Sequence, residues 1–441
     1  SSEGDPGKLT AVGGGTDSHG FGNSAKAAGI GASRVYGTGY DAKYNCVGDI
    51  TIKGGIVEAT GSKASGYGGP GIGGGTNDSS ITITGGDVTA DAGYTNNAGS
   101  AGIGSAYSQG GIKTITISGG TVNATGGSAG IGGGAYQGAG VILIDGGTVT
   151  AESKGVGAGI GGGGGVYGGD NMNINGSITI SGGTVTAAGS SYGAGIGGGG
   201  GNEQAYADAG AQASGNITIS GGTVTAKGGT YAPGIGSGAI VDHNSCTAAD
   251  VSGKMGTITI SGGKVTAENG SSFADGGKSY RVPSGNNNLD SGIGQGRNAS
   301  EVSQAAFADW ELQTGNGGAV QLVAKESVSD LKRNGEAYNP ATLVINGAEY
   351  YLLPEGCYNT GTGGAEVVIP SDAVTSTVTD LITALKNIDP NKGSFTSEEV
   401  EAVRGYAVTY NSLSESLQYY VDQQTEGHTL AEIQKAFKGK V

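Results

Sequence analysis

Short segments that alternate apolar and polar residues recur between residues 50 and 267. The clearest copy reads Ile-Thr-Ile-Ser-Gly-Gly-Thr-Val-Thr-Ala, from Ile217 to Ala226. Side chains alternate between the two faces of a strand, so the isoleucines, valine and alanine share one face and the threonines the other. The central Gly-Gly can adopt positive φ and turn the chain. Each copy therefore predicts two short strands joined by a corner.

The copies predict a solenoid. They run Ile50–Ala59, Ile81–Ala90, Ile115–Ala124, Ile142–Ala151, Ile178–Ala187, Ile217–Ala226 and Ile258–Ala267. A Gly-Ile-Gly tripeptide precedes the first copy and follows each one, centred on Ile30, Ile72, Ile103, Ile131, Ile160, Ile196, Ile235 and Ile293. A repeat this small cannot bury its own apolar face, so neighbouring repeats must stack on one another.

Stacking in register would place equivalent residues of successive repeats on top of one another. The predicted isoleucine ladder is Ile52, Ile83, Ile117, Ile144, Ile180, Ile219 and Ile260. The predicted valine ladder is Val57, Val88, Val122, Val149, Val185, Val224 and Val265. The high glycine content, 96 residues of 441, also suits a bundle of polyproline-II glycine helices, but the regular alternation favours strands.

The repeats resemble right-handed parallel β-helix proteins of the pectate-lyase-like superfold, in particular glycine-rich surface proteins of Gram-positive bacteria. The resemblance covers roughly residues 10–305. It implies an all-β, right-handed parallel β-helix. It implies less about activity, because the superfold includes lyases, hydrolases, phage adhesins and proteins that only bind.

The chain divides by pattern into three parts. Residues 1–305 form the predicted β-helix, with an irregular N-terminal coil around Ile30 as its cap. Residues 306–371 contain short strand-like segments and the turn signal Asn346-Gly347, which predicts a small β module capping the solenoid. Residues 372–441 show helical spacing and predict a C-terminal α-helical bundle.

Two capping boxes mark helix starts in the last part, Thr396 with Glu399 and Thr429 with Glu432. The segment resembles the small three-helix modules of Gram-positive cell-surface proteins. The residues that carry this resemblance are Ala407, Tyr410, Leu413, Tyr420 and Val421. Such modules are spacers or accessory domains, so the resemblance implies an extracellular, secreted or cell-surface location.

The formal net charge of −15 disfavours nucleic acid as a partner, because phosphate binding needs clustered Lys and Arg. The three cysteines, Cys46, Cys246 and Cys357, have no metal-binding spacing, and we expect free thiols. No apolar run is long enough to insert into a membrane. We expect a monomer.

The connections that follow Gly-Ile-Gly lengthen towards the C-terminal coils and predict a ligand-binding face. The long ones are Gly162–Ser177, Gly198–Asn216 and Ser237–Thr257. In a solenoid, insertions at one corner stack on one face, which is often the binding face. The candidate ligand-binding residues are Asp170, Asn171, Tyr167, Tyr192, Tyr206, Tyr231 and His243. Solvated loop acids and tyrosines that merely anchor loops are the alternative interpretation.

The same loops carry the candidate catalytic residues Glu203, Asp208 and Asp242, should the protein be an enzyme. Glycoside hydrolysis needs two carboxyl groups, one as acid and one as base or nucleophile. No resident cofactor or metal is expected, although Ca²⁺ is conceivable at Asp170-Asn171 and at Asn286–Asp290.

Outward Thr-x-Thr pairs at Thr148/Thr150, Thr184/Thr186 and Thr223/Thr225 have the layout of ice-binding solenoids. The β-propensity of threonine explains the same pairs, and Asp87, Asn123 and Lys264 interrupt the array.

Together these features lead us to expect an extracellular, surface-associated β-helix that binds polysaccharide or host glycan along its long-loop face, as an adhesin or carbohydrate-binding protein. A β-helical glycoside hydrolase or polysaccharide lyase using the same loops is the alternative. A stalk without a ligand is a third possibility.

Overall fold

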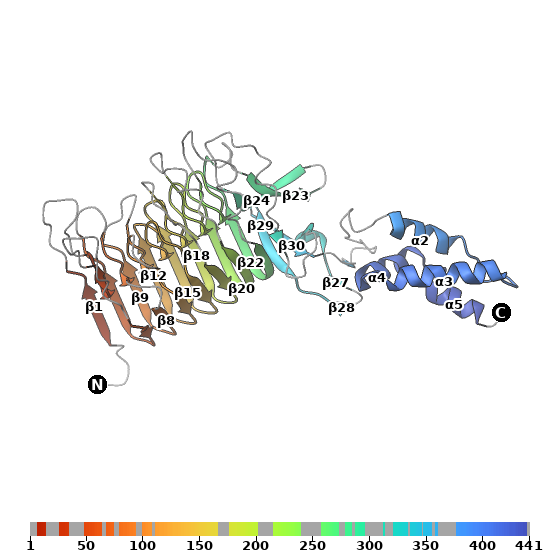
Figure 1. The fold of residues 1–441 in the computed structure, drawn as a ribbon, viewed down its shortest axis with the longest axis horizontal. Helices are drawn as coiled ribbons and strands as arrows, with labels where there is room; N and C mark the ends of the chain where they lie inside the picture. Colours follow the sequence, from red (N-terminus) through yellow and green to blue (C-terminus); the bar gives the residue numbers. More distant parts are fainter. Residues whose placement is uncertain are drawn as a thin grey trace. The chain divides into compact units, whose positions relative to one another are not determined.

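A computed structural model shows the chain as two compact units. Its described residues are 7–14, 26–34, 48–63, 68–74, 79–93, 99–107, 111–165, 176–201, 215–239, 257–272, 278–284, 287–295, 312–313, 321–333, 336–345, 347–354, 358–359 and 376–438. The first unit comprises Ser1–Gly315 and Ala341–Glu349, and the second comprises Asn316–Pro340 and Tyr350–Val441. In Figure 1 the first unit is a stack of parallel strands, and the helices lie in the second.

Each coil of the first unit contributes three extended segments. The Ile-x-Ile segments form β5 (Ile50–Ile52), β8 (Ser80–Ile83), β11 (Thr114–Ile117), β14 (Val141–Ile144) and β17 (Ser177–Ile180). The Val-x-Ala segments form β6 (Ile56–Thr60), β9 (Asp87–Asp91), β12 (Thr121–Gly126), β15 (Thr148–Ser153) and β18 (Thr184–Ala188). In the last two repeats both segments join across the Gly-Gly corner as β20 (Asn216–Lys227) and β22 (Ile258–Glu268).

The Gly-Ile-Gly tripeptides make a second, separate sheet. Its strands are β3 (Ile30–Gly31), β7 (Ile72–Gly73), β10 (Ile103–Gly104), β13 (Ile131–Gly132), β16 (Ile160–Gly161), β19 (Ile196–Gly197), β21 (Ile235–Gly236) and β24 (Asn287–Gln295). They pair in parallel, isoleucine on isoleucine, from Ile30 to Ile293. Strand β23 (Lys278–Ser284) pairs antiparallel with β24 at one end of this sheet.

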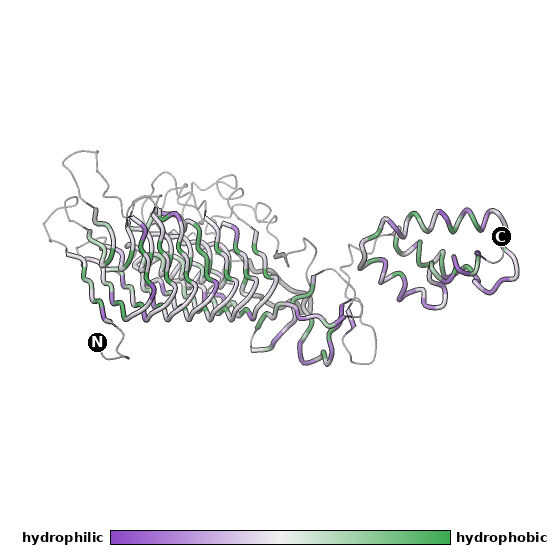
Figure 2. Tube along the Cα trace, turned by 90° about the horizontal axis from the view of Figure 1, so that it is seen from below, coloured by the Kyte–Doolittle hydropathy of each residue, from purple (hydrophilic) through white to green (hydrophobic). Residues whose placement is uncertain are grey.

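The predicted aliphatic ladders are confirmed. Ile180 pairs with Ile219 and Ile219 with Ile260, and all three side chains are fully buried. The valine ladder is equally regular, with Val185 opposite Val224 and Val224 opposite Val265. Figure 2 shows the consequence, because apolar residues recur at matching places in successive coils. The fold is therefore an all-β parallel solenoid with a buried aliphatic interior.

The threonine pairs are also stacked in register. Thr148 lies opposite Thr184, which lies opposite Thr223. In the same way, Thr150 lies opposite Thr186, which lies opposite Thr225. Most of these side chains are exposed. The predicted in-register layout of the threonine pairs is confirmed. The layout alone assigns these threonines no function.

Glycine at the Gly-Ile-Gly corner is required by backbone crowding. Gly161 has a φ of +135°, and a Cβ there would lie 2.0 Å from the carbonyl oxygen of Gly197. The same contact recurs down the sheet, for example between Gly104 and Gly132. Any side chain at this position would push the adjacent coil away, so the coils stack only with glycine there.

The solenoid extends beyond the recognisable repeats at both ends. At the N-terminal end, β1 (Lys8–Val12) pairs in parallel with β6 and sets Leu9 opposite Val57 and Ala11 opposite Ala59. Close by, β2 (Lys26–Ala27) pairs antiparallel with β4 (Ser33–Arg34). The first coil therefore contains a regular strand, where the sequence predicted an irregular cap.

At the other end, β25 (Leu312–Gln313) and β29 (Ala341–Ile345) both pair in parallel with β22. Leu312 lies opposite Ile258 and Leu343 opposite Val265, so leucine continues both ladders. The sequence prediction had assigned these residues to a separate module. They instead add a partial coil to the solenoid.

The remaining strands form a small β-module in the second unit. Strand β26 (Gln321–Ala324) pairs antiparallel with β30 (Ala348–Leu353). Strand β27 (Lys332–Arg333) pairs antiparallel with β28 (Glu336–Ala337) and β31 (Tyr358–Asn359), and a 3-10 helix spans Lys325–Ser327. The core contains Val323, Leu331, Leu353 and Tyr358. Gly347, between β29 and β30, has the positive φ of +82° that the turn signal demanded.

The described C-terminal residues form four helices, one more than the three-helix prediction. They are α2 (Ser376–Lys386), α3 (Ser397–Asn411), α4 (Glu415–Gln424) and α5 (Leu430–Phe437). Their shared core contains Val378, Leu381, Ile382, Leu385, Val403, Val421, Leu430, Ile433 and Phe437. The sequence prediction missed α4 as a separate helix, which starts at the N-cap Ser414 directly after α3.

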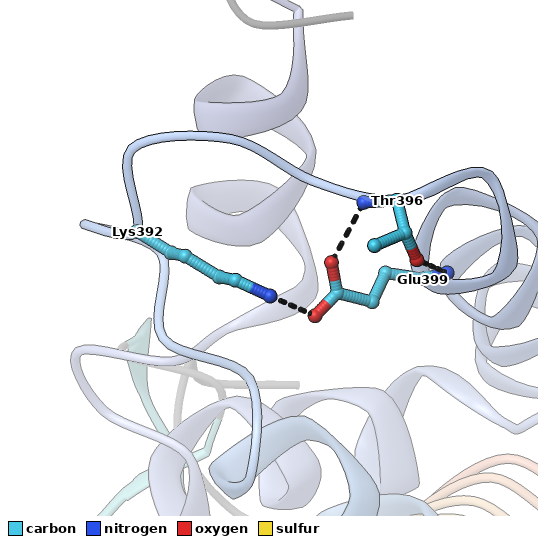
Figure 3. A network of polar contacts seen from close by, with 3 residues as sticks. All are labelled: Lys392, Thr396 and Glu399. Carbon is cyan, nitrogen blue, oxygen red and sulfur yellow. Dashed lines mark hydrogen bonds and ion pairs between the residues drawn. The ribbon is translucent and has the colours of Figure 1, made fainter.

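Both predicted capping boxes are confirmed. Figure 3 shows the first: the Thr396 side chain accepts from the Glu399 backbone N–H at 3.2 Å, and the Glu399 carboxylate accepts from the Thr396 N–H at 2.8 Å. Lys392 donates to the same carboxylate. The hydrogen bond from Lys392, followed by that from Thr396, lowers the pKa of Glu399.

Replacing Gly161 with alanine tests the crowded corner. We expect Gly161→Ala to lower the denaturant midpoint of the solenoid by the equivalent of roughly 2–3 kcal/mol, because Gly197 must move. Gly54→Ala is the control, since a Cβ there meets nothing within 4 Å. Equal midpoints for the two variants would contradict the close stacking.

Titrating the first capping box tests the charge on Glu399. A lowered pKa means that this carboxylate stabilises the fold above its unfolded pKa of about 4.3, and that the stabilisation is lost as the pH falls through the folded value. Glu399→Gln should therefore lower the melting temperature of the helices at pH 7 and match the wild type at strongly acidic pH. Glu401→Gln, on the same helix and largely exposed, should change little. If the difference in melting temperature between the wild type and Glu399→Gln stayed constant with pH, the ionic contribution of Glu399 would be excluded.

Candidate functional site

The three long loops leave the solenoid from stacked positions. Gly165 and Gly201 form a parallel β-bridge, and the Gly201 N–H donates to the carbonyl oxygen of Ala239 at 3.0 Å. These residues end the Gly-rich runs after Gly-Ile-Gly on three successive coils. The residues that directly precede 166–175, 202–214 and 240–256 therefore lie side by side, a coil apart.

The loops also return at stacked positions. Gly215 packs so closely on Gly176 that a Cβ on Gly215 would lie 2.0 Å from the Gly176 carbonyl oxygen. One coil on, the Ile217 N–H donates to the Thr257 carbonyl oxygen at 2.9 Å, and the Thr257 N–H donates to Asn216 Oδ1 at 3.0 Å. Because start and end points are both in register, the bases of the three loops occupy one corner of the solenoid. We call this corner the loop face.

Most predicted site residues lie on the loops themselves, outside the described residues. This holds for Asp170, Asn171, Tyr167, Glu203, Tyr206, Asp208, Asp242 and His243. The structure therefore places the bases of the loops that carry them and leaves the distances between their carboxyl groups untested. Asp170-Asn171 of the calcium hypothesis lies outside the described residues for the same reason.

Tyr192 and Tyr231 are the predicted site residues that the structure does describe, and it brings them together. Their rings lie 5.5 Å apart between centroids and are nearly parallel, at 9°. Both are half-buried. The Tyr192 carbonyl oxygen accepts from the Ala239 N–H at 2.6 Å, directly before loop 240–256. The pair therefore stands beside the base of that loop.

The stacking limits what these two rings can do. Each ring uses one face on its neighbour, and a spacing of 5.5 Å leaves no room for a sugar ring between them. What remains for a ligand is the outer face of the pair, the ring edges and the hydroxyl groups. The geometry favours a role in anchoring the loop bases, with ligand contact restricted to those parts.

Tyr107 and Tyr136 form a second pair of another kind. Their rings meet edge to face, 5.4 Å apart at 84°, and pack against buried Ala135. They follow Gly-Ile-Gly in their coils, whereas Tyr192 and Tyr231 precede it. The four described loop tyrosines thus form two separate pairs and not one continuous row.

Backbone strain coincides with both tyrosine pairs. Among the described residues, Tyr136 (φ 64°) and Ser191 (φ 43°) are the two non-glycine residues in the left-handed region. Ser191 directly precedes Tyr192, and its carbonyl oxygen accepts from the Tyr231 N–H at 3.0 Å. Such strain persists only where surrounding structure holds it, and it is commonest at functional positions.

Among the described residues, no cluster of three or more His, Cys, Asp or Glu side chains is suited to bind a metal ion. None of the helices in this part of the chain is both long enough and apolar enough to cross a membrane.

Comparison with known proteins identifies the repeat. A family model described as a β-helix repeat matches seven segments: residues 50–76, 81–107, 115–135, 142–164, 178–200, 217–239 and 258–294. Each segment contains one Ile-x-Ile, one Val-x-Ala and one Gly-Ile-Gly element, and the parallel pairing agrees with the match. No curated protein and no solved structure matches the chain. The first unit thus carries β-helix repeats and folds as a parallel β-helix.

Proposed function

We propose that this is an extracellular, surface-associated β-helix that binds polysaccharide or host glycan on its loop face, as a monomer. The observation that carries the proposal is the stacking of the loop bases, where Gly165, Gly201 and Ala239 follow one another in hydrogen-bonded succession. A rigid scaffold that gathers loops on one face is the usual design of a binding site.

The composition of the loops supports carbohydrate as the ligand. The loops combine carboxylates, amides and tyrosines, whose oxygens and nitrogens can bind sugar hydroxyl groups. They are almost free of Lys and Arg, which disfavours phosphate-rich ligands. The bases of the loops repeat along the solenoid at roughly 5 Å per coil, which suits a long polymer better than a small molecule.

The helices of the second unit support a surface location. They have capping boxes and a hydrophobic core of their own, as accessory modules of surface proteins do.

A glycan array with the intact chain tests the binding. We expect binding to a polymeric glycan, and we expect it to fall at least tenfold when residues 240–256 are replaced by a copy of residues 136–140. That segment makes the equivalent short connection in an earlier coil. Thr148→Ala is the control on an outward strand face. Silence across plant, host and bacterial glycans would remove the proposal, as would a shortened variant that binds unchanged.

Incubation with the bound polysaccharide separates binding from catalysis. The proposal predicts binding without product release. Release that disappears in Glu203→Gln or Asp242→Asn would instead establish the alternative, a glycoside hydrolase or polysaccharide lyase.

A further inference from the structure

A cavity of about 310 Å³ lies at the C-terminal end of the solenoid, away from the loop face. Its lining consists of Thr266, Ala267, Glu268, Asn269, Gly292, Val344, Ile345 and Gly347. All of these residues belong to the first unit. The volume is that of a site for a small ligand.

The cavity exists because the last strand leaves the ladder early. Pairing between β22 and β29 stops at Thr266 opposite Val344, whereas the preceding pair of strands continues as far as Lys227 opposite Glu268. The next residue of β29 is Ile345, where every earlier coil has alanine, from Ala59 to Ala267. A larger side chain thus follows at the point where the pairing of β22 with β29 ends.

The lining combines an apolar wall with hydrogen-bonding groups. Ala267 and Ile345 are buried, and Val344 is half-buried. Thr266 and Asn269 are half-buried, and Glu268 is exposed at the edge. Gly347 opens to free space, because a Cβ there would meet nothing within 4 Å. A ligand could therefore enter and find carboxylate, amide and hydroxyl groups beside aliphatic carbon.

The charges around the cavity are balanced, in contrast to a chain with a net charge of −15. Lys264 forms an ion pair with Glu349. Lys227 is paired in register with Glu268 on the neighbouring coil, so the two oppositely charged residues occupy the same face of adjacent coils. A charged ligand would gain little here, whereas a neutral ligand rich in hydroxyl groups could use both donors and acceptors.

We propose that this end cavity binds a small neutral polyhydroxylated molecule, a single sugar unit. Sugar hydroxyl groups would bind Glu268, Asn269 and Thr266, and the apolar face of the ring would pack on Val344, which is paired with Thr266 on the same face of the strands. This site goes beyond the loop face and does not depend on it.

Binding of methyl glycosides to the intact chain, followed by saturation-transfer NMR and calorimetry, tests this site. The probes are methyl glucoside, galactoside, mannoside and N-acetylglucosaminide. We expect at least one to bind, and we expect Glu268→Ala and Thr266→Tyr each to weaken it at least tenfold. Glu152→Ala and Thr150→Tyr are matched controls, because they occupy the same strand positions on an earlier coil and should bind as the wild type does.

Charged probes test the balance of charge. Glucuronate and glucosamine should bind no more tightly than the neutral glycoside, and tighter binding of either would overturn the neutral assignment. Absence of binding by all four glycosides, or equal loss in the matched controls, would overturn the site. The loop-shortened variant should keep its glycoside binding. A glycan-array signal that survives Glu268→Ala while no glycoside binds would leave the loop-face proposal standing and remove only this one.

Discussion

In-register contact between identical small residues is the interaction on which the structure depends. No single coil encloses a core, so each isoleucine and valine is buried by its counterpart above and below. That arrangement requires adjacent backbones to approach closely at the corners. A Cβ placed on Gly161 would lie 2.0 Å from the next carbonyl oxygen, and one on Gly73 would lie 2.2 Å from the equivalent oxygen. Close stacking of the coils therefore requires both glycine at these corners and aliphatic side chains between them.

The same regularity produces the loop face. Because every coil repeats the corner, residues inserted after Gly-Ile-Gly must leave from equivalent places on successive coils, as Gly165 and Gly201 do. Function can then vary in the loops while the ladders remain unchanged. The end cavity has the opposite origin, since it forms where the repeat fails and Ile345 replaces an alanine.

Much of the solenoid was predictable because period and alternation are local signals. The isoleucines from Ile52 to Ile260 occupy the same position in each repeat, and their pairing follows from that position. The terminal strands were harder, because Leu9 and Leu343 occupy ladder positions without the surrounding repeat motif. Helix α4 was missed since it follows α3 after a very short connection.

The site was predictable only in part. Loop growth is visible in the sequence, and so the common face could be inferred. The geometry of the tyrosine rings could not be inferred from the sequence. Tyr192 and Tyr231 precede Gly-Ile-Gly in their coils, whereas Tyr107 and Tyr136 follow it. The sequence positions alone do not reveal which rings pair. The end cavity depends on where β29 leaves β22, which no local pattern encodes.

Disulfide trapping between outward positions tests the stacking most directly. In a background with Cys46, Cys246 and Cys357 replaced by serine, Thr184→Cys with Thr223→Cys should cross-link rapidly, because these residues are paired on adjacent coils and parallel neighbours lie about 5 Å apart. Thr148→Cys with Thr223→Cys, two coils apart, should not cross-link. Trapping of the distant pair, or failure of the adjacent pair when both thiols are reactive, would contradict the in-register solenoid.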